Sequence, residues 1–225
     1  MPQDNIGEQK MREVLAKLKV LYPNDGTALK FGSIFQLSVA VILSAQCTDV
    51  RVNMVTKELF KKYKRPQDFV QIPQKKLEKL IYSTGFYRAK AKNIKGLARI
   101  VVEKYGGVVP KKMDELIALP GIGRKTANII LSEGYGIIEG IAVDTHVKRL
   151  SNRLGFTKSQ NPQVIERELM ELAPSQEWWF LSNALIWHGR RVCFARSPNC
   201  EGCELNKLCP SAFVVKNTSI QYSEK

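Results

Sequence analysis

The sequence predicts an all-α protein, and this prediction rests on three observations. Apolar residues recur at helical spacing along most of the 225-residue chain, as Met11, Leu15 and Leu18 illustrate. Residues that commonly start or stop helices separate these segments. No alternation of apolar and polar residues is long enough to indicate a β-strand. Repeats and low-complexity tracts are also absent from the sequence, and only the tail after about Phe213 has a loosely ordered composition.

The helical segments have recognisable ends. The first stops before Pro23, and Thr48 or Asp49 can cap the next. Pro73 can occupy the first turn of a segment that ends at Gly85. Two later segments also have clear ends: Gly106 and Gly107 close one, and Asn161 and Pro162 open the other. In these last four segments, in chain order, the apolar positions are Val52, Val55, Leu59 and Tyr63; Leu77, Leu80 and Ile81; Ile94, Leu97, Ile100, Val101 and Tyr105; and Val164, Ile165, Leu169 and Leu172.

The composition is that of a water-soluble protein with an excess of positive charge. Hydrophobic residues make up 44% of the chain and charged residues 25%. Neither a membrane-spanning run nor a signal peptide is visible, so a cytosolic location is expected. The formal net charge of +14 favours a polyanionic partner, most commonly nucleic acid, although a basic solvated surface would have the same composition.

The sharpest local signal is the segment LPGIGRKTANIIL, residues 119–131. A short helix can precede it, the Pro-Gly pair breaks that helix, and Gly123 gives a second permissive backbone position before a new helix near Arg124. Such a turn directs backbone N–H groups towards an anion and suits a DNA phosphate. An ordinary helix–turn–helix corner is the alternative, but the paired glycines followed by Arg124 and Lys125 favour DNA binding.

The segment IAVDTHVKRL, residues 141–150, places Asp144 where an apolar stretch meets a helix. The common role of an aspartate there is that of an N-cap. Helix N–H groups favour the charged form of such a carboxylate, which is useful where positive charge develops nearby.

Four cysteines near the C-terminus form the pattern C-x6-C-x2-C-x5-C: Cys193, Cys200, Cys203 and Cys209. Their close spacing in a chain of cytosolic character indicates a metal centre rather than disulfides. Zinc is one candidate, but structural zinc sites usually have two Cys-x-x-Cys pairs and only one is present. An iron–sulfur cluster fits the spacing somewhat better. Cys47 lies apart and suits a packed small apolar position.

Taken together, these segments resemble endonuclease III, a family of bifunctional DNA glycosylases of the helix–hairpin–helix superfamily. The matching motifs are LPGIGRKTA, VDTHVKRLSNRLG, LSAQCTDVRVN, GFYRAKAKNI, HGRRVC and the four-cysteine loop. The resemblance covers residues 10–210, and the order of the motifs is highly specific. It implies that the cysteine loop holds one 4Fe–4S cluster.

The resemblance also implies two helical domains with a DNA-binding groove between them. One is a continuous six-helix domain of residues 27–136 that ends in the helix–hairpin–helix. The other combines residues 1–26 with residues 137–225 and carries the cluster. The active site is expected at the junction, where Lys125 and Asp144 meet.

Residue roles follow by the same resemblance. Lys125 displaces the damaged base, forms a Schiff base and promotes β-elimination, while Asp144 stabilises positive charge and assists proton transfer. A lysine amine suits this role because desolvation or nearby cations can make it available as a nucleophile. Gln46 is expected to fill the space left by the flipped base, and the loop at Phe86 to wedge into the stack. A helix-terminal glutamine and a core aromatic are the alternatives for these two.

Further contacts with DNA are expected from the hairpin, from the entrance of the active site and from the basic cluster loop. They are Leu119, Gly121, Gly123, Arg124, His146, Arg190 and Arg196. The other histidine, His188, suits a packed or hydrogen-bonded core position.

Three functions remain to be compared. The first is a lyase-competent glycosylase acting on oxidised or ring-saturated pyrimidines in damaged double-stranded DNA. A monofunctional adenine or mismatch glycosylase is disfavoured because such relatives lack a lysine at position 125. A non-catalytic iron–sulfur DNA-binding module has no need for both Lys125 and Asp144. The expected enzyme is a monomer, cytoplasmic and associated with the nucleoid, and binds no membrane.

Overall fold

The structure is a computed structural model that describes residues 6–23 and 26–214. The described residues are helical with no strand, as the sequence predicts, and they include no helix that is both long and apolar enough to cross a membrane. The chain divides into two compact units: residues 27–139, and a discontinuous unit of residues 1–26 and 140–225. The division at residue 136 expected from the resemblance stays a prediction. Most of the tail after Phe213 lies outside the described residues.

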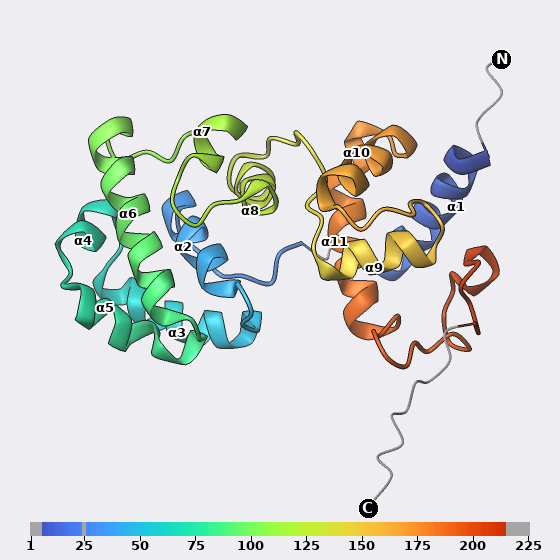
Figure 1. Ribbon diagram of the computed structural model, residues 1–225, viewed down its shortest axis with the longest axis horizontal. Helices are drawn as coiled ribbons and strands as arrows, with labels where there is room; N and C mark the ends of the chain where they lie inside the picture. The colour runs from blue at the N-terminus through green and yellow to red at the C-terminus, as the bar shows by residue number, and fades with distance from the viewer. Residues whose placement is uncertain (1–5, 24–25, 215–225) are drawn as a thin grey trace, which may run out of the picture. The chain divides into compact units, whose positions relative to one another are not determined.

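The 27–139 unit is built around two helices (Figure 1). Helix α2 is apolar on almost every side and is buried from Leu37 to Leu43. Helix α6 buries one face against the same core, including Leu97, and α4 and α5 lie beside it. The segments of this unit are α2 (Ile34–Ser44), α3 (Asp49–Lys62), α4 (Pro66–Gln71), α5 (Gln74–Ile81), the 3-10 turn η1 (Tyr82–Thr84), α6 (Tyr87–Tyr105), α7 (Met113–Ile117), α8 (Arg124–Ile129) and the π-helical turn η2 (Ile130–Tyr135).

Local sequence signals explain where several of these helices begin and end. Thr48 caps α3 by accepting a hydrogen bond from the backbone N–H of Arg51. Gly106 ends α6 in a left-handed conformation. The π-helical turn after α8 has no signal in the sequence pattern. It places Gly134 against α2, where a Cβ atom would lie 3.2 Å from a methyl group of Ile34.

The discontinuous unit has a separate core formed mainly by α1, α9, α10 and α11. Met11 and Leu18 of α1 are fully buried with Leu181 of α11. Asn161 caps α10, and Pro162 takes its first position, as predicted. The segments of this unit are α1 (Ile6–Leu21), α9 (Thr145–Arg153), α10 (Pro162–Leu172), the 3-10 turn η3 (Ser175–Glu177), α11 (Trp178–Arg191) and the 3-10 turn η4 (Asn206–Leu208).

Candidate functional site

The predicted hairpin lies between α7 and α8 in the 27–139 unit. The backbone N–H of Ile122 donates to the carbonyl of Leu119 at 3.1 Å and closes the turn. Gly121 has φ +79°, and a Cβ atom there would lie 2.9 Å from the Cβ of Asn93. Glycine is therefore required at position 121 both by the backbone angle and by the neighbouring helix.

Gly123 corrects the expectation of a second permissive backbone. Its φ is −98° with extended geometry, which any residue adopts, and a Cβ atom would meet nothing within 4 Å. The backbone angle and the surrounding space therefore do not demand glycine here, although Gly123 is the N-cap of α8, a position where glycine is tolerated well. The Leu119 side chain is also only 3% exposed, and its packing in the core leaves only its backbone for contact with DNA.

Lys125 occupies the first turn of α8, directly after the hairpin, and its side chain is exposed. Arg124 precedes it and is exposed as well. Ala127 and Asn128, further along α8, are buried. The helix is thus anchored by its later residues while its N-terminal turn presents the amine of Lys125 at the surface of the 27–139 unit.

Asp144 is the N-cap of α9 in the discontinuous unit, as predicted. Its Oδ1 accepts hydrogen bonds from the backbone N–H groups of His146 at 2.7 Å and Val147 at 2.9 Å. Oδ2 takes part in neither bond. The cap fixes the carboxylate at a helix N-terminus, where the helix dipole favours negative charge, and leaves one oxygen for a further interaction.

His146 follows Asp144 and packs closely against α11. A Cβ atom at Gly189 would lie 2.8 Å from its Nδ1, so glycine is required where α9 and α11 meet. Burial lowers the pKa of His146, and Asp144 opposes this shift. The Nη2 atom of Arg149 lies 3.2 Å from the same Nδ1. His146 is therefore held by its neighbours on α9 and α11.

The two predicted base-stack residues share an unusual backbone conformation. Gln46 has φ +52° and Phe86 has φ +46°, and Phe213 is the only other non-glycine residue with positive φ in the described part of the chain. The Phe86 side chain is 66% exposed, which excludes a core aromatic. Gln46 lies beyond the end of α2 and is exposed too. Cys47, next to it, packs against the core, as expected.

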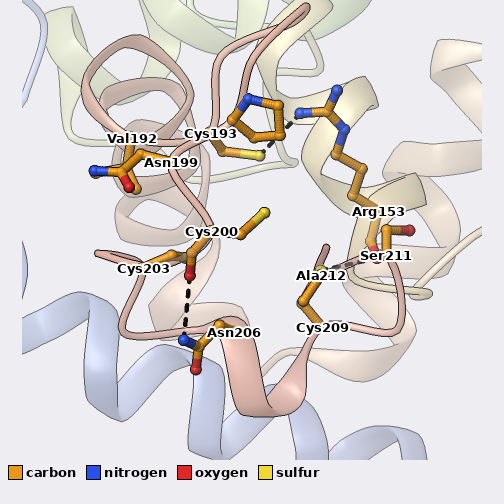
Figure 2. Close-up of a pocket in the computed structure, with 11 residues that line it drawn as sticks. Arg153, Val192, Cys193, Asn199, Cys200, Cys203, Asn206, Cys209, Ser211 and Ala212 are labelled. Carbon is orange, nitrogen blue, oxygen red and sulfur yellow. Dashed lines mark hydrogen bonds between the residues drawn. The ribbon is translucent and has the colours of Figure 1, made fainter. Parts of the chain in front are cut away.

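All four C-terminal cysteines line one pocket in the loop after α11 (Figure 2). Burial raises the pKa of the Cys203 and Cys209 thiols. Nevertheless, the described residues contain no group of three or more His, Cys, Asp or Glu side chains arranged to hold a metal ion. The donors themselves, four soft thiolates around one pocket, are of the kind that binds a zinc ion or an iron–sulfur cluster.

Basic side chains of α9 hold this loop in place. Arg153 donates to the Sγ of Cys193 at 3.2 Å (Figure 2). It also donates to the carbonyls of Phe194 and Ala195, each at 2.7 Å. Arg149 donates to the carbonyl of Cys193 at 2.9 Å. Neither arginine stands out in the sequence, because the partners of both lie 40 or more positions away.

His188 has hydrogen-bonding partners on both sides of its ring, as expected of a core histidine. Its Nδ1 lies 3.0 Å from the hydroxyl of Tyr22, and its Nε2 lies 3.3 Å from the Sγ of Cys203. Burial lowers the pKa of His188 to about 4.

Arg190 and Arg196, two of the predicted DNA contacts, are exposed at the end of α11 and in the cysteine loop. The Arg190 guanidinium lies 5.2 Å from the ring centre of Trp187.

Fold and motifs together define the class of protein. Residues 39–175 match the family model of the HhH-GPD superfamily of base excision DNA repair proteins. The chain belongs to this superfamily and, within it, to the endonuclease III family. It is 51% identical over 205 residues to endonuclease III from Synechocystis sp., covering 91% of this chain and 94% of that protein.

Two solved structures are similar over almost the whole chain. One is a non-covalent complex of endonuclease III with DNA, and the other is a trapped covalent intermediate of endonuclease III with DNA. Each has a TM-score of 0.88 and 44% identity and covers 91% of this chain and 96% of the solved chain. The chain is therefore a base excision repair enzyme whose relatives include proteins solved on DNA.

Proposed function

We propose that this protein is a bifunctional DNA glycosylase and AP lyase that excises oxidised or ring-saturated pyrimidines from duplex DNA. The observation that carries this proposal is the exposed amine of Lys125 in the first turn of α8, directly after the Gly121 hairpin. The trapped covalent complex of a similar endonuclease III with DNA supports a nucleophile that bonds to the substrate.

Lys125 is the nucleophile. Its neutral amine attacks the anomeric carbon of the damaged nucleotide, and the bond from this carbon to the base breaks as the base leaves. The amine then forms a Schiff base with the opened sugar. Loss of a proton from the adjacent C2′ atom drives β-elimination, which breaks the C3′–O bond and nicks the strand 3′ to the lesion.

Asp144 stabilises the positive charge that develops on the sugar and assists proton transfer. Two backbone hydrogen bonds fix its Oδ1, so the carboxylate needs little reorganisation when that charge appears. The proposal requires Lys125 and Asp144 to face the same nucleotide. Neighbouring His146 is held by Gly189 and Arg149 and lines the same part of the site.

The hairpin and the two left-handed turns bind and open the duplex. The backbone around Gly121 and Gly123, with Arg124, contacts the DNA phosphates, which explains a glycine at position 123 that the fold does not demand. Phe86 wedges into the base stack and Gln46 fills the space of the extruded base. Flipping costs a few kcal/mol, and less for a damaged base, which helps the enzyme to select lesions.

Cys193, Cys200, Cys203 and Cys209 hold one 4Fe–4S cluster. When bound, the cluster supplies ligation that ties together a loop with little buried apolar surface. Arg190 and Arg196 can then contact the DNA backbone from a stiff segment. The protein acts as a monomer on chromosomal DNA, in the cytoplasm and in association with the nucleoid.

Borohydride trapping on duplex DNA with one thymine glycol tests the reaction class. A covalent protein–DNA adduct is expected for the native protein and not for a Lys125→Ala variant that still folds and binds DNA. Absence of an adduct from folded native protein on both thymine glycol and abasic-site DNA would contradict the lysine mechanism. Base release without strand cleavage would instead indicate a monofunctional glycosylase.

A further inference from the structure

Lys90 is a buried lysine to which the mechanism above gives no role. It lies in the first turn of α6, and its side chain is only 4% exposed. Lysine is almost never fully buried unless its charge has partners, because removing an ammonium group from water is costly. The partners of Lys90 therefore indicate what this position does.

The amine of Lys90 joins two helical segments that are distant in sequence. Its Nζ donates to the carbonyl of Leu43 at 2.8 Å and to the carbonyl of Thr84 at 2.7 Å. Leu43 lies in the last turn of α2, where carbonyls have no partner within the helix. Thr84 is the last residue of η1. One ammonium group thus donates to a carbonyl at the end of each segment. Burial lowers the pKa of Lys90.

Both segments lead directly into the exposed residues with left-handed backbone. Gln46 follows Leu43 closely, and Phe86 follows Thr84 after one glycine. A non-glycine residue in this conformation is strained and persists only where the surrounding structure holds it. The carbonyl of Phe86 also accepts the backbone N–H of Lys90 at 3.0 Å. Lys90 therefore contacts the residues that lead into both the Gln46 turn and the Phe86 turn, and it also bonds to the backbone of Phe86.

We infer that Lys90 is a positioning residue that holds the Gln46 and Phe86 turns in a fixed arrangement, so that both enter the base stack together. This inference rests on the function proposed above, and it assigns Lys90 no contact with the reacting atoms. It predicts that loss of Lys90 impairs reactions that require opening of a duplex more than reactions on single strands, where no stack has to be opened.

Lys95 provides a matched control in the same helix. Its Nζ also donates to two carbonyls at the end of a helix, those of Val70 at 3.0 Å and of Ile72. These residues lie at the end of α4, which leads into α5 and into neither left-handed turn. Loss of Lys95 removes bonds of the same kind from carbonyls that adjoin neither Gln46 nor Phe86.

The experiment compares Lys90→Met and Lys95→Met with the native protein under single-turnover conditions. One substrate is duplex DNA with thymine glycol, and the other is a single-stranded oligonucleotide with one abasic site. Lys90→Met is expected to slow excision from the duplex by about 10- to 100-fold, since small displacements of positioning groups have effects of that size. Cleavage of the single strand should change by less than about two-fold, and Lys95→Met should leave both rates within about two-fold, because neither change displaces the reacting groups.

Lys90→Gln keeps N–H donors on a side chain one atom shorter, which can reach one of the two carbonyls. Lys90→Gln should show a smaller loss of excision rate on the duplex than Lys90→Met, with little change on the single strand. If Lys90→Met does not fold, Lys90→Gln alone tests the positioning role. Equal losses on both substrates, or no loss on the duplex, would overturn the positioning role. Native protein that is inactive on both substrates would overturn the proposed function itself, and the role of Lys90 with it.

Discussion

The 27–139 unit and the C-terminal loop of residues 192–214 hold their functional residues in different ways. In the 27–139 unit, an extensive apolar core supports the hairpin and the two left-handed turns. In the loop, Leu205 is the one buried side chain among residues 192–214, and cysteines and arginine contacts surround a pocket instead. The comparison indicates that core packing fixes the first region, whereas polar contacts and, in the function proposed above, cysteine ligation of a cluster fix the second.

Removing a cluster ligand should have the largest effect, and the effect should stay local. Cys203→Ser is expected to lose the bound iron and to make the loop sensitive to limited proteolysis, since metal ligation stabilises such a segment. The control is Cys47→Ser, because Cys47 packs against the core of the 27–139 unit. This variant should keep its iron. Iron analysis and mass spectrometry of the fragments measure both. An equally protected loop in Cys203→Ser would contradict the dependence on ligation.

A cavity in the core of the 27–139 unit should lower the stability of that unit and leave the iron content of the loop unchanged. Leu97→Ala removes a fully buried side chain of α6 and should cost about 2–5 kcal/mol of unfolding free energy. Leu80→Ala, at a side chain that is 40% exposed, should cost much less. Urea unfolding measures the loss, and iron content should be unchanged. Loss of iron in folded Leu97→Ala would show that the two regions depend on one support.

Asp144 allows capping and charge to be separated. Asp144→Ala should cost about 1 kcal/mol of stability through loss of the α9 cap, whereas Asp144→Asn keeps an acceptor oxygen and should cost little. Both variants lose the carboxylate and should slow excision by about 100-fold or more. Thermal unfolding and single-turnover excision provide the two readouts. Full activity of Asp144→Asn would show that the charge is not needed.

The smallest effect is expected from a single exposed arginine of the loop. Arg196→Ala should weaken binding to undamaged DNA and reduce the slope of log affinity against log salt by about one. Lys61→Ala removes a charge that already pairs with Glu58 at 2.7 Å and serves as the comparison. Fluorescence anisotropy at several salt concentrations gives both slopes. An unchanged slope in Arg196→Ala would exclude a phosphate contact at this position.

Local signals in the sequence were sufficient to predict several helices and their caps, although α2, α4 and α11 were not among the predicted segments. Thr48, Asp144 and Asn161 cap helices as predicted because a cap depends on residues two or three positions away. Gly121 likewise has the conformation that the turn requires. In contrast, the left-handed backbone of Gln46 and the exposure of Phe86 depend on contacts with the rest of the fold, and the sequence pattern left alternatives open for both.

Residues whose partners are distant in sequence could not be predicted from the pattern. Arg149 and Arg153 resemble any other basic residue of α9 until the loop of Cys193 is placed beside them. Lys90 is one of 35 basic residues, and only its burial and its contacts with Leu43 and Thr84 distinguish it. Gly123 is the reverse case, because the sequence predicted a backbone conformation that favours glycine and the structure has an ordinary extended one.

The most direct test of the account is to locate the covalent bond to DNA. Native protein is trapped with borohydride on thymine glycol duplex, digested with nuclease and protease, and the modified peptide is sequenced by mass spectrometry. The proposed mechanism predicts a reduced sugar adduct on the Nζ of Lys125 in the first turn of α8. An adduct on any other amine, with Lys125 unmodified, would contradict it.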